Sequence, residues 1–194
     1  GVGNESAWTG PGIFNTEFEN PLCSPPGIAI PDNGCGSNEL SQTILVSGAP
    51  GVQLGLDVIV DEVRMNITHT WDSDLDVFLR SPNGTEVELT SANGGNGDNY
   101  GSGASCAGTY TTFRMDAFTS VVGGAAPFQG VYIPEGDFLD WDGDNPNGLW
   151  TIVICDGAGA DVGSLHYFEV VLIPAPSCYP PSGVNVTNVS ATAG

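Results

Sequence analysis

Residues 58–89 read VIVDEVRMNITHTWDSDLDVFLRSPNGTEVEL, and this stretch decides the fold class. Every second residue is apolar over residues 63–71, apart from His69 on the same face, and again at residues 75, 77 and 79. Successive side chains of a strand point to opposite faces, so this period of two predicts strands with one buried face. The acidic pair at residues 61–62 interrupts the alternation, which predicts a bulge, and Asn83-Gly84 predicts a tight hairpin turn.

The same kind of pattern continues on both sides of this stretch. Between residues 28 and 173, short apolar runs are separated by loops rich in Gly, Asn and Asp, and the apolar residues do not follow a helical period. Residues 150–155 are apolar apart from Thr151, which predicts a central strand buried on both faces. Residues 165–172 supply a last apolar strand. We predict an all-β fold, a jelly-roll β-sandwich of the galactose-binding-like kind.

The charge of the chain is strongly one-sided. Its 194 residues include 23 acidic and three basic ones, which gives a formal net charge of −20 at pH 7, and none of the basic residues is a lysine. Binding to nucleic acid or to an anionic membrane surface needs clustered Lys and Arg, so we expect neither as a partner. The sequence has no run of about 18 apolar residues, so we expect no membrane insertion.

Five cysteines are spread along the chain, and none lies in a CxxC motif. Scattered cysteines in an acidic chain without lysine favour disulfides, and therefore an exported protein that is secreted or held at the cell surface. Buried free thiols are the alternative. Sequence does not fix the connectivity, but we expect Cys23 to pair with Cys35 and Cys106 with Cys155, which leaves Cys178 over.

Composition divides the chain into four parts. Residues 1–24 lack periodicity and are expected to form an irregular lead-in, whereas residues 25–173 hold the sandwich. Residues 174–183, PAPSCYPPSG, are expected to be a Pro-rich linker. Residues 184–194 then resemble the start of a fibronectin type III domain, the alternative being an ordered tail of the main domain. The first residues lack the pattern of a signal peptide, so we expect a piece of a longer precursor.

Acidic residues gather in the expected loops. Three aspartates are spaced two apart over residues 72–76, and three more lie in DWDGDNPNG at residues 140–148. Carboxylates and carbonyls on Gly- and Asn-rich loops are the hard oxygen ligands that Ca²⁺ selects. We therefore expect calcium as a cofactor, the alternative being surface acidity that only confers solubility. The candidate metal ligands are Asp72, Asp74, Asp76, Asp98, Asp116, Asp140, Asp142, Asp144, Asp156 and Asp161.

The sequence offers little for catalysis. It has two histidines and neither a GxSxG nor an HExxH motif, so we expect no catalytic residue. A pair of glycosidase carboxylates is disfavoured because the acids lie in open loops, where nothing raises the pKa of one of them. We expect His69 to be a core or sheet-edge residue and His166 to be a surface residue.

Aromatic residues leave room for a binding function. The candidates for stacking on a sugar are Trp8, Trp71, Tyr100 and Trp141. Core packing is the alternative for all of them and is favoured for Trp71. Trp141 lies in an acidic loop and is expected to be the best exposed of the set.

Two long motifs then point to one family. Residues 68–85 contain THTW, an Asp-Leu pair and SPNGT, and residues 145–156 read NPNGLWTIVICD, followed by Gly-Ser-Leu at residues 163–165. Together they resemble the P domain of kexin/furin-type proprotein convertases over about residues 28–173. The segment GGNGDNY at residues 94–100 resembles the variant of this domain in secreted proteins of Bacteroidetes-type bacteria.

This resemblance implies a non-catalytic jelly roll that supports the folding and stability of a neighbouring peptidase domain. It implies calcium binding in bacterial relatives, with Asp74 and Asp156 as the shared acids and Asp98 and Asp116 as further ligands. Arg114 stands where many relatives have an acid, which puts the role of Asp116 in doubt.

We therefore expect a calcium-binding accessory domain of a secreted multidomain protein, a serine or metallo-endopeptidase. Its partners would be neighbouring domains of the same precursor. The alternative is a carbohydrate-binding or adhesion module of a secreted bacterial polysaccharide-degrading or surface protein, with a protein or glycan ligand.

Overall fold

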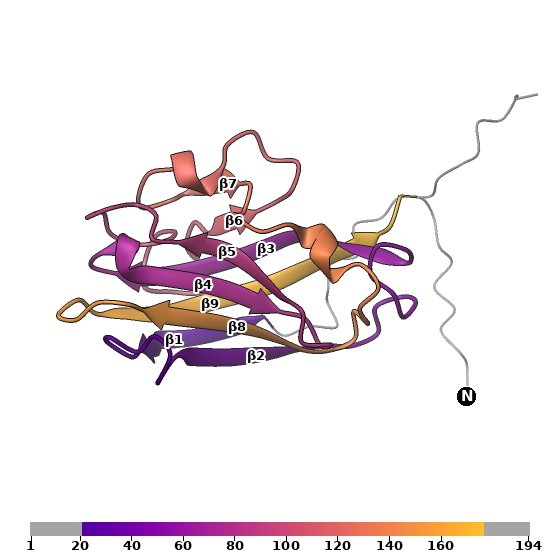
Figure 1. Cartoon of the computed structure of the whole chain (residues 1–194), viewed down its shortest axis with the longest axis horizontal. Helices are drawn as coiled ribbons and strands as arrows, with labels where there is room; N and C mark the ends of the chain where they lie inside the picture. The colour runs from indigo at the N-terminus through magenta and orange to yellow at the C-terminus, as the bar shows by residue number, and fades with distance from the viewer. Residues whose placement is uncertain (1–20, 177–194) are drawn as a thin grey trace, which may run out of the picture.

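A computed structural model describes residues 21–176, which form two β-sheets packed face to face (Figure 1). The strands are β1 (Leu22–Ile30), β2 (Leu40–Val46), β3 (Val58–His69), β4 (Leu75–Arg80), β5 (Glu86–Ser91), β6 (Thr111–Phe113), β7 (Gly130–Tyr132), β8 (Gly148–Asp156) and β9 (Gly163–Pro174). Three short 3-10 turns complete the set, η1 (Asp72–Asp74), η2 (Val121–Gly123) and η3 (Phe138–Trp141). The prediction of an all-β sandwich is confirmed.

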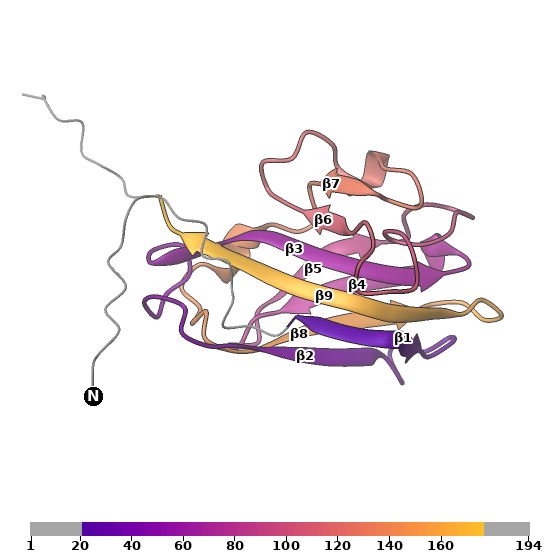
Figure 2. The same ribbon diagram turned by 180° about the vertical axis from the view of Figure 1, so that it is seen from behind.

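The two sheets have the strand orders β1-β9-β3-β6-β7 and β2-β8-β4-β5. Figure 2 shows the first sheet from its own side, with β9 and β3 crossing the domain side by side. In the second sheet β8 lies between β2 and β4, so the expected central strand is confirmed. The register of β3 against β9 shifts between Val60 and Glu62, which confirms the bulge that residues 61–62 predicted.

The core lies between the sheets and follows the alternation of the sequence. Each of β3, β4 and β8 sends every second side chain inward, and those side chains are fully buried: Val63, Met65, Ile67, Leu75, Val77, Leu79, Trp150, Ile152 and Ile154. The turn between β4 and β5 closes as expected, because Gly84 N donates to Ser81 O at 3.0 Å and Gly84 has a φ of +95°. A positive φ of this size favours glycine.

Two disulfides form, but their pairing differs from the predicted one. Cys23 on β1 pairs with Cys106, and Cys35 pairs with Cys155 at the end of β8. The predicted pairs Cys23–Cys35 and Cys106–Cys155 are wrong, because strand order and not sequence distance decides which cysteines meet. Cys178 lies outside the described residues.

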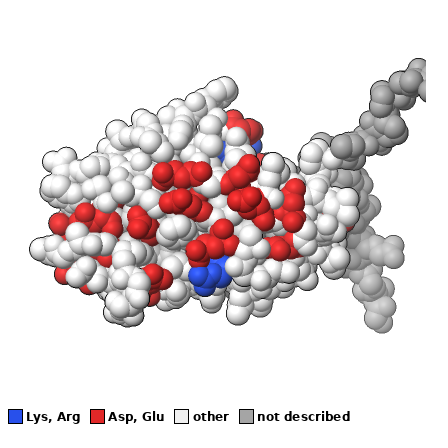
Figure 3. All heavy atoms as spheres, viewed as in Figure 1, with Lys and Arg blue, Asp and Glu red and all other residues white. Residues whose placement is uncertain are grey.

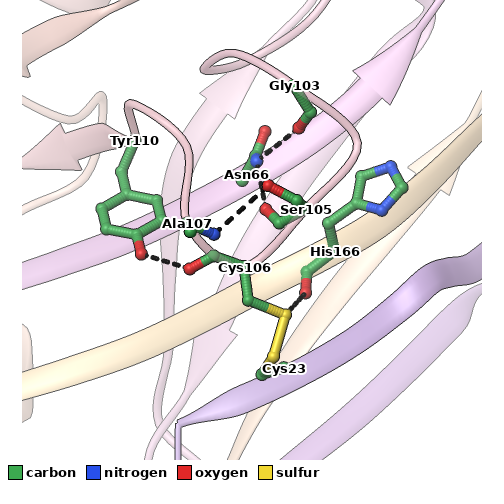
Figure 4. Close-up of a disulfide and its surroundings, with 8 residues drawn as sticks. All are labelled: Cys23, Asn66, Gly103, Ser105, Cys106, Ala107, Tyr110 and His166. Carbon is green, nitrogen blue, oxygen red and sulfur yellow. Dashed lines mark hydrogen bonds between the residues drawn. A yellow bond between two sulfur atoms is a disulfide. The ribbon is translucent and has the colours of Figure 1, made fainter.

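The loop over residues 101–110 folds back onto the five-stranded sheet (Figure 4). Asn66 on β3 donates through Nδ2 to Gly103 O at 2.7 Å and to Ser105 O at 2.8 Å. Tyr110 OH donates to Cys106 O at 2.7 Å, and the Tyr110 ring stacks on Tyr167 of β9 with centroids 4.3 Å apart. The disulfide to Cys23 therefore closes a loop that side-chain hydrogen bonds also hold.

His166 is buried rather than on the surface, so that expectation was wrong. The residue is 1% exposed, and its Nε2 lies 2.9 Å from the Thr68 hydroxyl oxygen. Burial lowers the pKa of His166, which favours the neutral ring. Gly27 on β1 covers the ring closely, since a Cβ at that position would overlap it.

Candidate functional site

The ten candidate aspartates do not form one cluster. β4 and β8 are antiparallel neighbours, and Leu75 at the start of β4 pairs with Asp156 at the end of β8. Residues before β4 therefore meet residues after β8 at one end of the sandwich. Residues after β4 meet residues before β8 at the other end. Figure 1 shows η1, in magenta, and η3, in orange, at these two ends.

The η1 end, defined here as η1 with the loops over residues 93–99 and 156–162, holds half of the set. Its members are Asp72, Asp74, Asp98, Asp156 and Asp161. The η3 end, defined as η3 with the loops over residues 54–57 and 142–147, holds Asp140, Asp142 and Asp144. Asp76 lies on the outer face of β4, and Asp116 pairs with Arg114.

Asp72 is the most unusual of these groups, because its side chain is fully buried and only one of its two carboxylate oxygens accepts a hydrogen bond from the described residues. Asp72 N donates to Gly97 O at 2.9 Å, and Asn99 N donates to the Oδ1 of Asp72 at 2.8 Å. The Oδ2 of Asp72 is buried and has no hydrogen-bond partner among the described residues. A buried carboxylate oxygen without a partner is costly, by roughly 1–3 kcal/mol or more.

Burial raises the pKa of Asp72 from its ordinary value to about 7. The backbone hydrogen bond from Asn99 opposes this rise, and the nearby Asp98 carboxylate adds to it. Gly94 makes the close approach of the 93–99 loop feasible, since its φ is +87° and a Cβ there would lie 2.9 Å from the Asp72 Cβ. The η1 end therefore brings a desolvated carboxylate and a second acid against the Gly-rich 93–99 loop, whose Gly95 and Gly97 carbonyls accept hydrogen bonds from backbone N–H groups of η1.

This donor set fits a hard cation. The Asp72 and Asp98 carboxylates are hard oxygen ligands of the kind that Ca²⁺ selects, whereas Zn²⁺ would need Cys or His. Only one group of three His, Cys, Asp or Glu ligand atoms in residues 21–176 lies within 4.8 Å of one another, and it is Cys35, Asp76 and Cys155. Two of these three form a disulfide. A cation at Asp72 would therefore rely on backbone carbonyls and water besides Asp98.

Asp156 forms a buried pair with His69. The His69 Nε2 lies 3.2 Å from the Oδ2 of Asp156, and both side chains are at most 1% exposed. The His69 Nδ1 lies 2.9 Å from Trp71 O, and Ala158 N donates to the Oδ1 of Asp156 at 3.2 Å. The expectation that His69 is a satisfied core histidine is confirmed, and the pair ties β3 to β8.

Asp74 and Asp161 lie beside this pair. The pKa of Asp74 is raised by burial first and then by the negative charges of Asp156 and Asp161, while His69 lowers it. The Oδ1 of Asp161 accepts a hydrogen bond from the Thr70 hydroxyl at 2.9 Å. These three carboxylates repel one another without meeting closely enough to share one small ligand.

Two of the four aromatic residues considered for sugar stacking, Tyr100 and Trp141, are buried. Both are 0% exposed, so the expectation that Trp141 is the best exposed of the set was wrong, and Tyr100 follows the core-packing alternative. Tyr100 stacks on Phe128 with centroids 4.5 Å apart, and Trp141 packs between Phe138 and Trp150. Trp71, expected to pack in the core, is instead 42% exposed. Trp8 lies outside the described residues.

Sequence reasoning missed the groups that make Asp72 unusual. The glycines at residues 94, 95 and 97 contribute to the family resemblance, and Gly94 and Gly97 also bring the backbone close to Asp72. Three of the five residues from 94 to 98 are glycine, and this density of glycine is a local signal for close backbone approach. The pairing of His69 with Asp156 spans 87 residues and has no local signal.

The pH dependence of stability tests the burial of Asp72. Its pKa is higher in the folded state than in the unfolded chain, so the folded protein binds the extra proton and the cost of ionising Asp72 grows as the pH rises from about 4 to about 7. Asp72→Asn removes this titration. In metal-free buffer, the free energy of unfolding of Asp72→Asn relative to the unmodified protein should increase over that pH range. A flat difference in urea titrations would contradict the burial.

Comparisons with known proteins gave one family model and similar solved structures. The family model described as proprotein convertase P-domain matches residues 60–172, which is more than half of the chain. The serine protease of Aeromonas sobria in complex with its chaperone is 17% identical, with a TM-score of 0.44 over 80% of this chain and 26% of that chain. The same protease alone is 14% identical, with a TM-score of 0.42 and the same coverage. This chain thus spans about a quarter of either protease chain.

No curated protein matches the chain. Among the described residues, no helix is long and apolar enough to cross a membrane. The family match over residues 60–172 includes nearly all of β3 and β9, the η1 end, and η3 with the loop over residues 142–147. The chain belongs to the proprotein convertase P-domain family.

Proposed function

We propose that this P domain is a non-catalytic accessory module of an exported peptidase and that calcium bound at its η1 end stabilises it. The observation that carries the calcium part is the buried, unpartnered Oδ2 of Asp72 beside Asp98. A divalent cation there would supply the missing partner and offset the repulsion between the two carboxylates. Asp72, Asp98 and carbonyls of the 93–99 loop would hold the ion.

Family membership supports the accessory role, and the buried histidine pair is consistent with it. His69 and Asp156 have the residue types of a general base and its orienting acid. Both are closed off from solvent, and the second ring nitrogen of His69 faces the Trp71 carbonyl. A base must come within hydrogen-bond reach of a substrate proton, which this pair cannot do without unfolding its surroundings.

Thermal unfolding with and without calcium tests the proposal. A ligand that binds only the folded state adds about 2.7 kcal/mol at 100 times its Kd, which for a domain of this size corresponds to a rise of roughly 5–10 °C in Tm. We expect such a rise between protein in chelator and protein in millimolar calcium. Asp72→Asn should abolish most of the rise, whereas the matched variant Asp140→Asn at the η3 end should keep it.

The same substitution has an opposite effect without metal. Asp72→Asn removes the buried charge, so its Tm in chelator should equal or exceed that of the unmodified protein. Equal Tm values for the unmodified protein in chelator and in calcium would refute calcium stabilisation. A calcium response that survives in Asp72→Asn would move the site away from Asp72.

A further inference from the structure

An apolar groove of about 130 Å³ lies at the η3 end, away from Asp72. Its floor includes the buried residues Leu54, Phe138 and Trp141. Its rim includes Leu139, which is 65% exposed, and Met115, which is 38% exposed. Exposed apolar side chains around a concave apolar surface are typical of protein interaction sites.

One charged group lines this groove, the carboxylate of Asp142. Asp142 is exposed, and it lies so close to Gly55 that a Cβ on Gly55 would overlap the carboxyl group. Within residues 21–176, no ion pair is formed by Asp142, although seven ion pairs involve other residues. The groove therefore combines an apolar interior with one negative charge that has no counter-ion in the described part of the chain.

No lysine or arginine of the chain pairs with the Asp142 carboxylate in residues 21–176. Arg64 pairs with Glu62 and Glu169, Arg80 with Glu86, and Arg114 with Asp61, Glu62 and Asp116. These three arginines are the only Lys or Arg residues in all 194 positions. Figure 3 shows the imbalance on one face, where acidic side chains spread widely around few basic ones. A basic side chain that pairs with Asp142 would therefore come from a different polypeptide sequence, and this disfavours a second copy of this chain as the partner.

The position of the groove also suits a neighbour in the same precursor. Pro174 at the end of β9 pairs with Val58, and Ala175 N donates to Asp57 O at 3.0 Å. The described chain therefore leaves the sandwich beside Gly55 and Leu54. Segments tethered at this point meet the groove at effective concentrations that reach the millimolar range for short linkers, so weak contacts suffice.

We propose that the groove binds a bulky apolar side chain flanked by lysine or arginine, presented by a neighbouring domain of the same precursor. This proposal rests on the accessory function proposed above. The apolar side chain would contact Leu54, Phe138 and Trp141 within the groove, and the flanking cation would pair with Asp142 at its rim. Leu139 and Met115 would cover the stem of the bound side chain.

Short peptides followed by NMR titration of the ¹⁵N-labelled chain test this proposal. The probes are Ac-Lys-Leu-Lys-NH₂, Ac-Glu-Leu-Glu-NH₂ and Ac-Lys-Gly-Lys-NH₂. We expect the first to give saturable amide shifts over residues 54–60 and 138–142, the second to bind at least ten-fold more weakly, and the third to give no saturable shift there. No saturable shift in this region with the first probe up to 10 mM, or equal binding of the first and third probes, would overturn the proposal.

Variants separate the two contributions. Leu139→Asp should abolish binding of the Lys-Leu-Lys peptide, and Asp142→Asn should remove most of its preference over the Glu-Leu-Glu peptide. Val162→Asp is the matched control, because Val162 is 66% exposed and lies at the η1 end. Binding unchanged by Leu139→Asp would overturn the proposal. The calcium response of Tm involves the opposite end, so failure of peptide binding leaves the calcium experiment unaffected and the two outcomes can be told apart.

Discussion

Replacing Cys35 and Cys155 together by serine is expected to lower the free energy of unfolding by about 5 kcal/mol. The disulfide joins residues 120 positions apart, and the chain-entropy relation for a loop of this length gives a loss of that order when the cross-link is removed. The bond also fastens the loop after β1 to the end of β8, where Gly34 N donates to Asp156 O at 2.8 Å. Urea unfolding followed by tryptophan fluorescence measures the change.

The double variant Cys23→Ser with Cys106→Ser is the comparison. Its loop spans 83 positions, and because the entropy depends on the logarithm of loop length, the expected loss is similar, about 4.6 kcal/mol. The hydrogen bonds from Asn66 and Tyr110 remain to hold the 101–110 loop. A loss below about 1 kcal/mol in both double variants would contradict a structural role for these bonds. Non-reducing peptide mapping that joined Cys23 to Cys35 would contradict the pairing itself.

The strands were predictable because their signal is local. An alternating strand needs only its own residues to show the period of two, as β3 does, and β8 is marked as a central strand by its continuous apolar run. The bulge at residues 61–62 and the turn at Asn83-Gly84 are equally local. Each of these features is fixed by backbone sterics and by which side chains face the core, so sequence alone was sufficient.

Features that depend on strand order were not predictable. Cys106 meets Cys23 because β1 pairs with β9 and the 101–110 loop crosses the same sheet, and nothing near either cysteine encodes that arrangement. The division of the acids between two ends has the same origin. Sequence showed that aspartates fill the loops, but only the antiparallel pairing of β4 with β8 decides which loops share an end. The calcium ligands remain a prediction for this reason.

The burial of Trp141 is an intermediate case, because a local signal existed and pointed correctly. In a 3-10 turn, residues i and i+3 lie on the same side. Phe138 and Trp141 have this spacing in η3, and both are buried, whereas Leu139 and Asp140 between them are exposed. The acidic composition of the loop predicted an exposed tryptophan. The three-residue spacing of Phe138 and Trp141 indicates a buried one, and the structure agrees with the spacing.

Trp141→Ala is therefore expected to destabilise the domain by about 3–5 kcal/mol, as is typical when a large buried aromatic residue is truncated. Its ring centroid lies 4.9 Å from that of Phe138 and 5.1 Å from that of Trp150, and its Nε1 donates to Thr85 O at 3.1 Å. Trp71→Ala is the matched control, since Trp71 is 42% exposed, and should cost less than about 1 kcal/mol. Urea titrations of both variants give the comparison.

The comparison also decides how a glycan experiment must be interpreted. If Trp141→Ala lost binding to a polysaccharide, unfolding would explain the loss, because the ring is 0% exposed and cannot stack on a sugar in the folded state. Trp71→Ala would then be the informative variant, since its ring is accessible while its removal leaves the core intact. A Trp141→Ala protein that kept its stability within 1 kcal/mol would instead show that the η3 turn does not pack as described, and the groove proposed above would fail with it.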